Sequence, residues 1–181
     1  MGERLVNALN VELDLIEDDD LANFAEQALM MVDDSYCDMP SSPSGMYHQP
    51  GESQVLHIRR VVYLLTIFCN MLKIEEKARD IFLVAGILHD MCKFKKEEDG
   101  SYHTDIMHPL LPRLKLKGLN VLLDSEGEQF ETIMDLIEGH MGIWGVNPKF
   151  IPRFNEQENM FGVEWILHMA DNIATKYWGE V

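Results

Sequence analysis

The stretch that most constrains the fold of this chain is a run of eight apolar or small residues, Ile81–Leu88, which leads directly into His89 and Asp90. We expect this run to be a buried helix. Neighbouring side chains on a helix point roughly 100° apart, so His89 and Asp90 can present an imidazole and a carboxylate to one shared site. Other metal-capable residues lie on or at the edge of further helix-like segments, namely His57, His108, His140 and Asp171. The sequence therefore predicts that several helices bring these side chains to one cleft.

Apolar residues at helical spacing run through most of the chain, which indicates a mostly or entirely helical protein. Asp18–Asp20 is an acidic helix start before the apolar stripe of Leu21, Phe24 and Leu29. The other expected helices run from about Ser53 to Leu72, from near Glu75 to just past Asp90, from Pro109 onward, from about Glu126 to His140 and from about Glu158 to Trp178. Residues 35–53 and 93–104 are expected to be loops, and 119–123 is either strand or helix.

Composition limits the classes of partner. A length of 181 residues predicts one domain, and a formal net charge of −16 opposes broad binding to nucleic-acid backbones and to anionic membranes. The longest strongly apolar run falls short of the ~20 residues that a membrane helix needs, and the first residues do not resemble a signal peptide. Three cysteines without CxxC spacing read as reduced thiols. We expect a cytoplasmic protein.

The ordered histidines and aspartates resemble the HD-domain superfamily of metal-dependent phosphohydrolases, especially its small stand-alone members from bacteria and phages. Leu88-His-Asp-Met-Cys-Lys93 is similar to the family's Leu-His-Asp-Ile-Gly-Lys, and Met169-Ala-Asp-Asn-Ile173 to its final Ala-Asp motif. The Pro40–His48 stretch resembles a loop that precedes the first histidine in some members. The resemblance implies an all-α bundle in which residues 35–181 form the HD domain and residues 1–34 a helical segment packed on it.

The resemblance also implies a binuclear metal site. The first divalent ion would be held by His57, His89, Asp90 and Asp171, and the second by Asp90, His108 and His140. Asp90 would bridge the two ions, and water between them would become the nucleophile. Imidazole and carboxylate ligands suit Mn, Fe, Co, Ni or Zn, and Mg is a further candidate. His103 and Asp105 are nearby alternatives to His108. We prefer His108 because it opens a helix, while His103 belongs to the polar loop.

Further residues are expected to act on the substrate, a small phosphorylated compound such as a nucleotide. Lys93 follows Asp90 by three residues, and its counterpart in the family often reaches a substrate phosphate, so Asp90 and Lys93 are the expected catalytic residues. Arg60 and Lys176 are candidates for additional phosphate contacts. His48 and Trp144 are expected to border the substrate pocket. The oligomeric state is left open by the sequence.

Two other functions fit the same pattern of residues. Mixed-valent di-iron oxygenases resemble this ligand order, but use the metals to activate dioxygen. The Met141–Trp144 and Ser41–Gly45 segments are more similar to the hydrolase branch. A non-catalytic nucleotide-binding module is the third interpretation, and it is disfavoured because none of the six expected ligands is missing. A metal-dependent phosphohydrolase is therefore the leading hypothesis.

Overall fold

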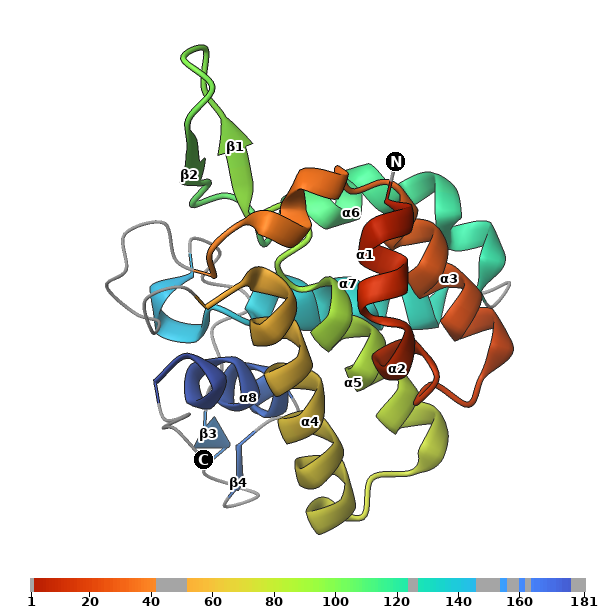
Figure 1. Cartoon of the computed structure of the whole chain (residues 1–181). Coiled ribbons are helices and arrows are strands. Elements are labelled where there is room, and N and C mark those ends of the chain that lie inside the picture. Colours follow the sequence, from red (N-terminus) through yellow and green to blue (C-terminus); the bar gives the residue numbers. More distant parts are fainter. Residues whose placement is uncertain are drawn as a thin grey trace.

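The structure, a computed structural model, describes residues 2–41, 52–123, 127–145, 154–155, 160–161 and 164–176. Within these ranges the chain is a bundle of α-helices with two short hairpins (Figure 1), so the predicted all-α class is confirmed. Helix α5 (Glu76–Leu88) occupies the middle of the bundle. The helices packed against it are α3 (Asp19–Met30), α4 (Gln54–Leu72), α7 (Glu128–Gly139) and α8 (Glu164–Lys176).

Helix α5 is central because its second half is apolar on all sides. Every residue from Phe82 to Leu88 is buried, as expected for a helix without a polar face. The close approach of α4 depends on Gly86, where an added Cβ would lie 2.4 Å from Cδ1 of Leu65. The helix ends at Leu88, slightly earlier than predicted, because the amides of Met91 and Lys93 form short turn bonds to Leu88 and Asp90. The buried helix therefore delivers His89 and Asp90 at its end.

Helix α4 has the bounds that its sequence predicts. The Ser53 hydroxyl accepts a hydrogen bond from the Leu56 amide at 3.2 Å, and Lys73 ends the helix with a left-handed φ of 55°. By length and composition α4 qualifies as a membrane span, in contrast to the expectation from apolar runs alone. It packs against α5 and α8, however, and its Val61 and Leu65 are fully buried and lie next to Gly86 of α5. That packing is the role of a core helix.

A buried carboxylate of α5 binds the backbone at the start of α3. Helices α1 (Glu3–Ala8) and α2 (Asn10–Leu13) precede α3, whose N-cap Asp18 accepts from the amides of Asp20 and Leu21. Asp80 of α5 is 1% exposed and accepts from the amides of Glu17 and Asp18 at 2.8 and 2.9 Å. The predicted acidic start of α3 is therefore both capped locally and bound to the central helix.

A hairpin replaces the loop that was predicted between residues 93 and 104. Strands β1 (Phe94–Lys96) and β2 (Tyr102–Thr104) pair in antiparallel register and project from the helices (Figure 1). Gly100 in the turn has a φ of +84°, and the Asp99 carboxylate accepts from the Ser101 amide. At the hairpin base the Phe94 ring lies 5.4 Å from the Tyr36 ring. Three-residue strands are too short to show the alternation by which sequence predicts a strand.

The remaining boundaries differ in detail from the prediction. Helix α6 (Leu111–Leu116) begins two residues after Pro109 and carries Pro112 in its first turn. The 119–123 stretch, which the sequence left as strand or helix, lies in a 3₁₀ helix, η2 (Lys117–Leu122), and in Leu123, which follows it. Two other 3₁₀ helices are η1 (Asp34–Asp38) and η3 (Gly142–Trp144). Strands β3 (Phe154–Asn155) and β4 (Met160–Phe161) pair where the last helix was expected to begin, so α8 starts later.

Candidate metal centre

Six side chains from five parts of the fold meet at one place. His57 comes from α4, His89 and Asp90 follow α5, His108 precedes α6, His140 follows α7, and Asp171 lies on α8. The four histidines and Asp90 are at most 2% exposed, and the Asp171 side chain is 20% exposed. Each of these residues was predicted as a metal ligand, and the structure brings all six together. The cluster falls into two half-sites that share Asp90.

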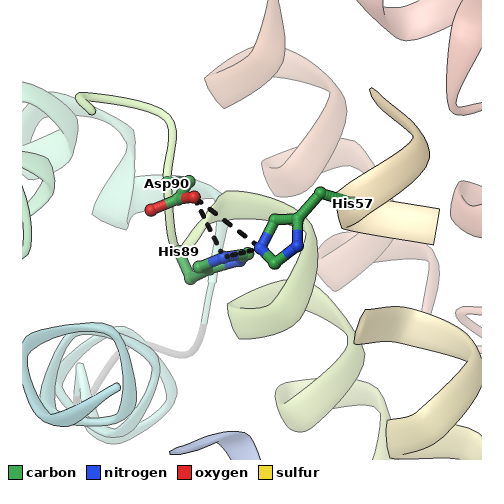
Figure 2. Close-up of side chains that lie close together, drawn as sticks. All are labelled: His57, His89 and Asp90. Atoms are coloured by element: carbon green, nitrogen blue, oxygen red, sulfur yellow. Dashed lines mark hydrogen bonds and ion pairs between the residues drawn. The ribbon is translucent and has the colours of Figure 1, made fainter. Parts of the chain in front are cut away.

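The first half-site consists of His57, His89, Asp171 and one oxygen of Asp90. Figure 2 shows His57 and His89 turned toward each other beside Asp90. The Nε2 atoms of the two histidines are 3.3 Å apart. Oδ2 of Asp90 lies 3.4 Å from His89 Nε2 and 3.8 Å from His57 Nε2. Oδ1 of Asp171 lies 3.1 and 3.9 Å from Nε2 of His57 and His89. Atoms that bind one cation at ~2.1 Å can be up to ~4.2 Å apart, so these separations suit a metal ion.

The second half-site consists of His108, His140 and the other oxygen of Asp90. Oδ1 of Asp90 lies 3.2 Å from His108 Nε2 and 3.7 Å from His140 Nε2. The two Nε2 atoms are 3.3 Å apart. Asp90 therefore directs one carboxylate oxygen to each half-site, which is the arrangement that a bridging ligand requires. The alternative residue His103 lies instead on β2, half-exposed, with Nδ1 3.0 Å from Glu97 Oε1.

Hydrogen bonds to the backbone fix the tautomer of three of the histidines. Nδ1 of His89, His108 and His140 lies 2.6–2.8 Å from the carbonyl oxygen of the residue three positions earlier. Because a carbonyl only accepts, each Nδ1 carries the proton and each Nε2 presents a lone pair to the centre. Facing lone pairs at 3.3 Å, as in His108 and His140, repel each other unless a cation lies between them. The donor set therefore fits divalent metal ions.

The charges in the cluster also favour metal binding. Burial, together with the neighbouring His89 and His108, lowers the pKa of His140 to about 3. Burial opposes ionisation of Asp90, but Lys93 and His89 nevertheless hold its pKa well below the usual range. The pKa of Asp171 is also lowered, because His57 outweighs the effect of burial. Burial opposes protonation of His89, but the charge of Asp90 nevertheless raises its pKa, so without metal a proton competes for this imidazole. A metal ion requires neutral imidazole and ionised carboxylate, and it would replace that proton as the cation beside Asp90.

Asp90 is held by three donors that are not metal ligands. Lys93 Nζ lies 2.6 Å and Gln54 Nε2 2.8 Å from Oδ2, while the Tyr36 hydroxyl donates to the Asp90 carbonyl at 2.5 Å. Lys93 was predicted to lie near Asp90, but Gln54 and Tyr36 were missed. The signal for Gln54 was present, because it precedes His57 by three residues on the same helical face. Tyr36 had no local signal, because it is 54 residues from Asp90.

The segment that carries His140 is supported from α8. His168 is 6% exposed, and its Nδ1 lies 2.7 Å from the carbonyl oxygen of His140. Its ring lies 5.2 Å from the Trp165 ring and packs closely on Gly142. A Cβ on Gly142 would lie 2.3 Å from His168 Cε1, and the φ of +56° also favours glycine. Gly142 and His168 thus fix the chain directly after His140.

A charged cluster connects the two helices of the second half-site. Arg113 of α6 bonds to three acidic residues of α7, which are Glu131, Asp135 and Glu138. The contact with Glu138 is 2.5 Å, and Glu138 is 8% exposed. Arg113 follows His108 by five residues, and Glu138 precedes His140 by two. The cluster therefore fixes α6 against α7 close to the facing histidines.

The predicted substrate residues have varied positions. Nη1 of Arg60 lies 2.8 Å from Oε1 of Glu52, so its guanidinium is engaged in an ion pair. Trp144 is 54% exposed, and its ring lies 5.7 Å from that of His168. His48 and the side chain of Lys176 lie outside the described residues. Of the predicted substrate-binding residues, Lys93 is the one that contacts a proposed metal ligand within the described part of the chain.

Comparison with known proteins gives one match. A model of the HD domain family matches residues 55–175, which is more than half of the chain and spans all six side chains of the cluster. Comparisons with curated proteins and with solved structures found no significant match.

Proposed function

Since the chain belongs to the HD-domain family, we propose that it is a metal-dependent phosphohydrolase that cleaves a phosphoester of a nucleotide or a related small phosphorylated compound. The proposed cofactors are two divalent metal ions, one for each half-site. The observation that carries this proposal is the division of Asp90 between two groups of ligands whose atoms all lie within 4.8 Å of one another in each group. A single carboxylate with an oxygen facing each group is suited to hold two ions side by side.

The chemistry follows from the types of residue present. When bound, divalent cations supply Lewis-acid chemistry, because they activate water near neutral pH and offset charge on phosphoryl oxygens. Asp90 contributes one oxygen to each half-site, and Asp171 adds a second carboxylate to the first. Burial limits the access of water to the ligands but opposes ionisation of the carboxylates, and Lys93 beside Asp90 and His57 beside Asp171 keep them ionised despite it. This arrangement supports a site for an anionic substrate in a chain whose net charge is −16.

Lys93 is the residue that favours a phosphorylated substrate. Its side chain is 12% exposed, and its ammonium group lies 2.6 Å from Asp90 Oδ2. We expect the flexible side chain to exchange this contact for a phosphate oxygen when substrate binds. Arg60, Lys176, His48 and Trp144 are retained as proposed substrate contacts. The contacts given above for Arg60 and Trp144 do not indicate which part of the substrate these residues would bind.

The test is metal analysis of protein purified without chelator, followed by a phosphate-release screen over nucleotides and simple phosphate esters. The proposal predicts divalent metal in the protein and release of phosphate that stops when the metal is removed by a chelator and resumes when it is restored. Iron together with oxygen uptake, and without phosphate release, would instead support the oxygenase. Nucleotide binding without turnover would support the non-catalytic module.

A further inference from the structure

Gln54 is a buried polar residue beside the metal centre to which the family resemblance assigns no role. It is 0% exposed at the first position of α4, and its Nε2 lies 2.8 Å from Oδ2 of Asp90. An ionised carboxylate only accepts hydrogen bonds, so the nitrogen of the amide faces Asp90 and the oxygen faces elsewhere. Gln54 precedes His57 by three residues, so both side chains lie on the same side of α4.

The amide oxygen of Gln54 has no hydrogen-bond partner within the part of the chain that the structure describes. Oε1 is enclosed and accepts no hydrogen bond from any residue that the structure describes. Bond lengths of about 1.23 and 1.33 Å in the amide place Oε1 within roughly 5.4 Å of Asp90 Oδ2. Buried oxygens without a partner are rare, and ordered water or a ligand usually satisfies them. The atom that satisfies Oε1 therefore belongs near the metal centre.

The carboxylate of Asp90 needs a residue that fixes its orientation. The Tyr36 hydroxyl fixes the backbone carbonyl of Asp90 at 2.5 Å, but it leaves the carboxylate free to rotate about its last bond. Lys93 contacts the same oxygen as Gln54, but it is partly exposed and carries a long flexible stem. Gln54 is enclosed at the rigid start of a helix that Ser53 caps. Among the three donors, it is the one best placed to fix the direction of both carboxylate oxygens.

We infer that Gln54 is a positioning residue of the metal centre, which directs Asp90 Oδ2 to the first half-site with its Nε2 and accepts a hydrogen bond from a water molecule at the centre with its Oε1. This inference rests on the proposed function, since it assumes that divalent ions occupy the cluster. Residues that orient metal ligands usually change metal affinity by 10- to 100-fold when they are removed. The same magnitude is expected for Gln54.

The test compares the affinity of the full-length, metal-free protein for Mn²⁺ in wild type and two variants. Gln54→Met keeps a similar length but removes the amide, and Gln54→Asn keeps the amide but withdraws it by about one C–C bond, roughly 1.5 Å. Gln129→Met is the matched control, because Gln129 is a buried glutamine of α7 and lies 11 residues, roughly 16 Å along the helix, before His140. Free Mn²⁺ is measured by its EPR signal, and thermal unfolding of the metal-free proteins is measured in parallel.

The inference predicts that both Gln54 variants bind Mn²⁺ at least about ten-fold more weakly than wild type, while Gln129→Met binds as wild type does. A Gln54 variant that is folded and binds Mn²⁺ within two-fold of wild type would overturn the role. Failure of both Gln54 variants to fold would also overturn it, because the residue would then be structural. If wild type itself does not bind Mn²⁺, the proposed function fails first, so the two failures are distinguishable.

Discussion

Replacement of Asp90 by alanine is expected to lower stability and metal affinity together. In the metal-free protein the carboxylate accepts hydrogen bonds from Lys93 and Gln54, and neighbouring positive charge keeps its pKa well below the usual range despite burial. Hydrogen bonds to a charged group contribute about 1.5–3 kcal/mol each. The variant also avoids the cost of burying a charge, which offsets part of this loss, so we expect the free energy of unfolding to fall by about 2–4 kcal/mol. The carboxylate thus stabilises the fold even without metal.

Thermal unfolding of the metal-free protein and Mn²⁺ titration measure the two effects separately. For a domain of this size, about 2–4 kcal/mol corresponds to a decrease in Tm of about 5–15 °C, and the variant should still fold because domains of this kind have about 5–15 kcal/mol of stability. Asp90→Ala should also fail to bind two equivalents of Mn²⁺. Asp80→Ala is the matched control, because Asp80 is equally buried and accepts from the Glu17 and Asp18 amides. It should lose stability but keep metal affinity.

Two results would refute this reasoning. An Asp90→Ala variant that is as stable as wild type without metal would show that the donors around the carboxylate do not stabilise the fold. An Asp80→Ala variant that loses Mn²⁺ binding to the same degree would show that metal affinity follows general stability. In that case the loss in Asp90→Ala could not be assigned to a missing ligand.

Three further predictions test other parts of the centre. Gly142→Ala should lower the Tm by several degrees and weaken metal binding, because the added Cβ would lie 2.3 Å from His168 Cε1 and the φ of +56° disfavours alanine. An unchanged Tm would contradict this prediction. Lys93→Ala should reduce kcat/KM on a phosphate ester by about ten-fold or more, equivalent to ~1.4 kcal/mol, with unchanged metal content. A wild-type rate would show that Lys93 does not act on the substrate. Because the pKa of His140 is lowered to about 3, the unfolded state binds more protons at pH values between that pKa and the ordinary histidine value. The stability of the metal-free protein should therefore fall as the pH drops from about 6.5 toward 3. In denaturant titrations, His140→Gln should lose less stability over this pH range than wild type. An equal loss in both proteins would contradict the assignment to His140.

The parts of the fold that sequence predicts are those with a local signal. The start of α3, both ends of α4 and the burial of α5 follow from caps and from apolar spacing within each segment. The β1–β2 hairpin was missed because its strands are too short for a pattern and the Phe94–Tyr36 contact at its base joins distant parts of the chain. Helix α6 was placed two residues early because Pro109 and Pro112 both suit a first turn.

The residues of the candidate site also differ in how far the sequence predicts them. The six ligand positions were available from the order of histidines and aspartates and from the resemblance to HD domains. Of the residues that hold Asp90, Lys93 was predicted, because it is three positions away. The contacts of Gln54 and Tyr36 with Asp90 were missed, because they span 36 and 54 positions of sequence. The support that His168 gives to His140 has no local signal either, because the contact of 2.7 Å joins residues 28 positions apart. Ligand types follow a motif, but the groups that orient them depend on tertiary packing.

The most direct test of the shared-carboxylate centre is EPR spectroscopy of the full-length protein titrated with Mn²⁺. If Asp90 gives one oxygen to each half-site, two Mn²⁺ ions bind per chain and their signals show spin coupling, because the ions share a bridging ligand. Asp90→Ala should then lose the coupled signal. Absence of Mn²⁺ binding, or two bound ions whose signals remain uncoupled, would contradict a binuclear centre built around Asp90.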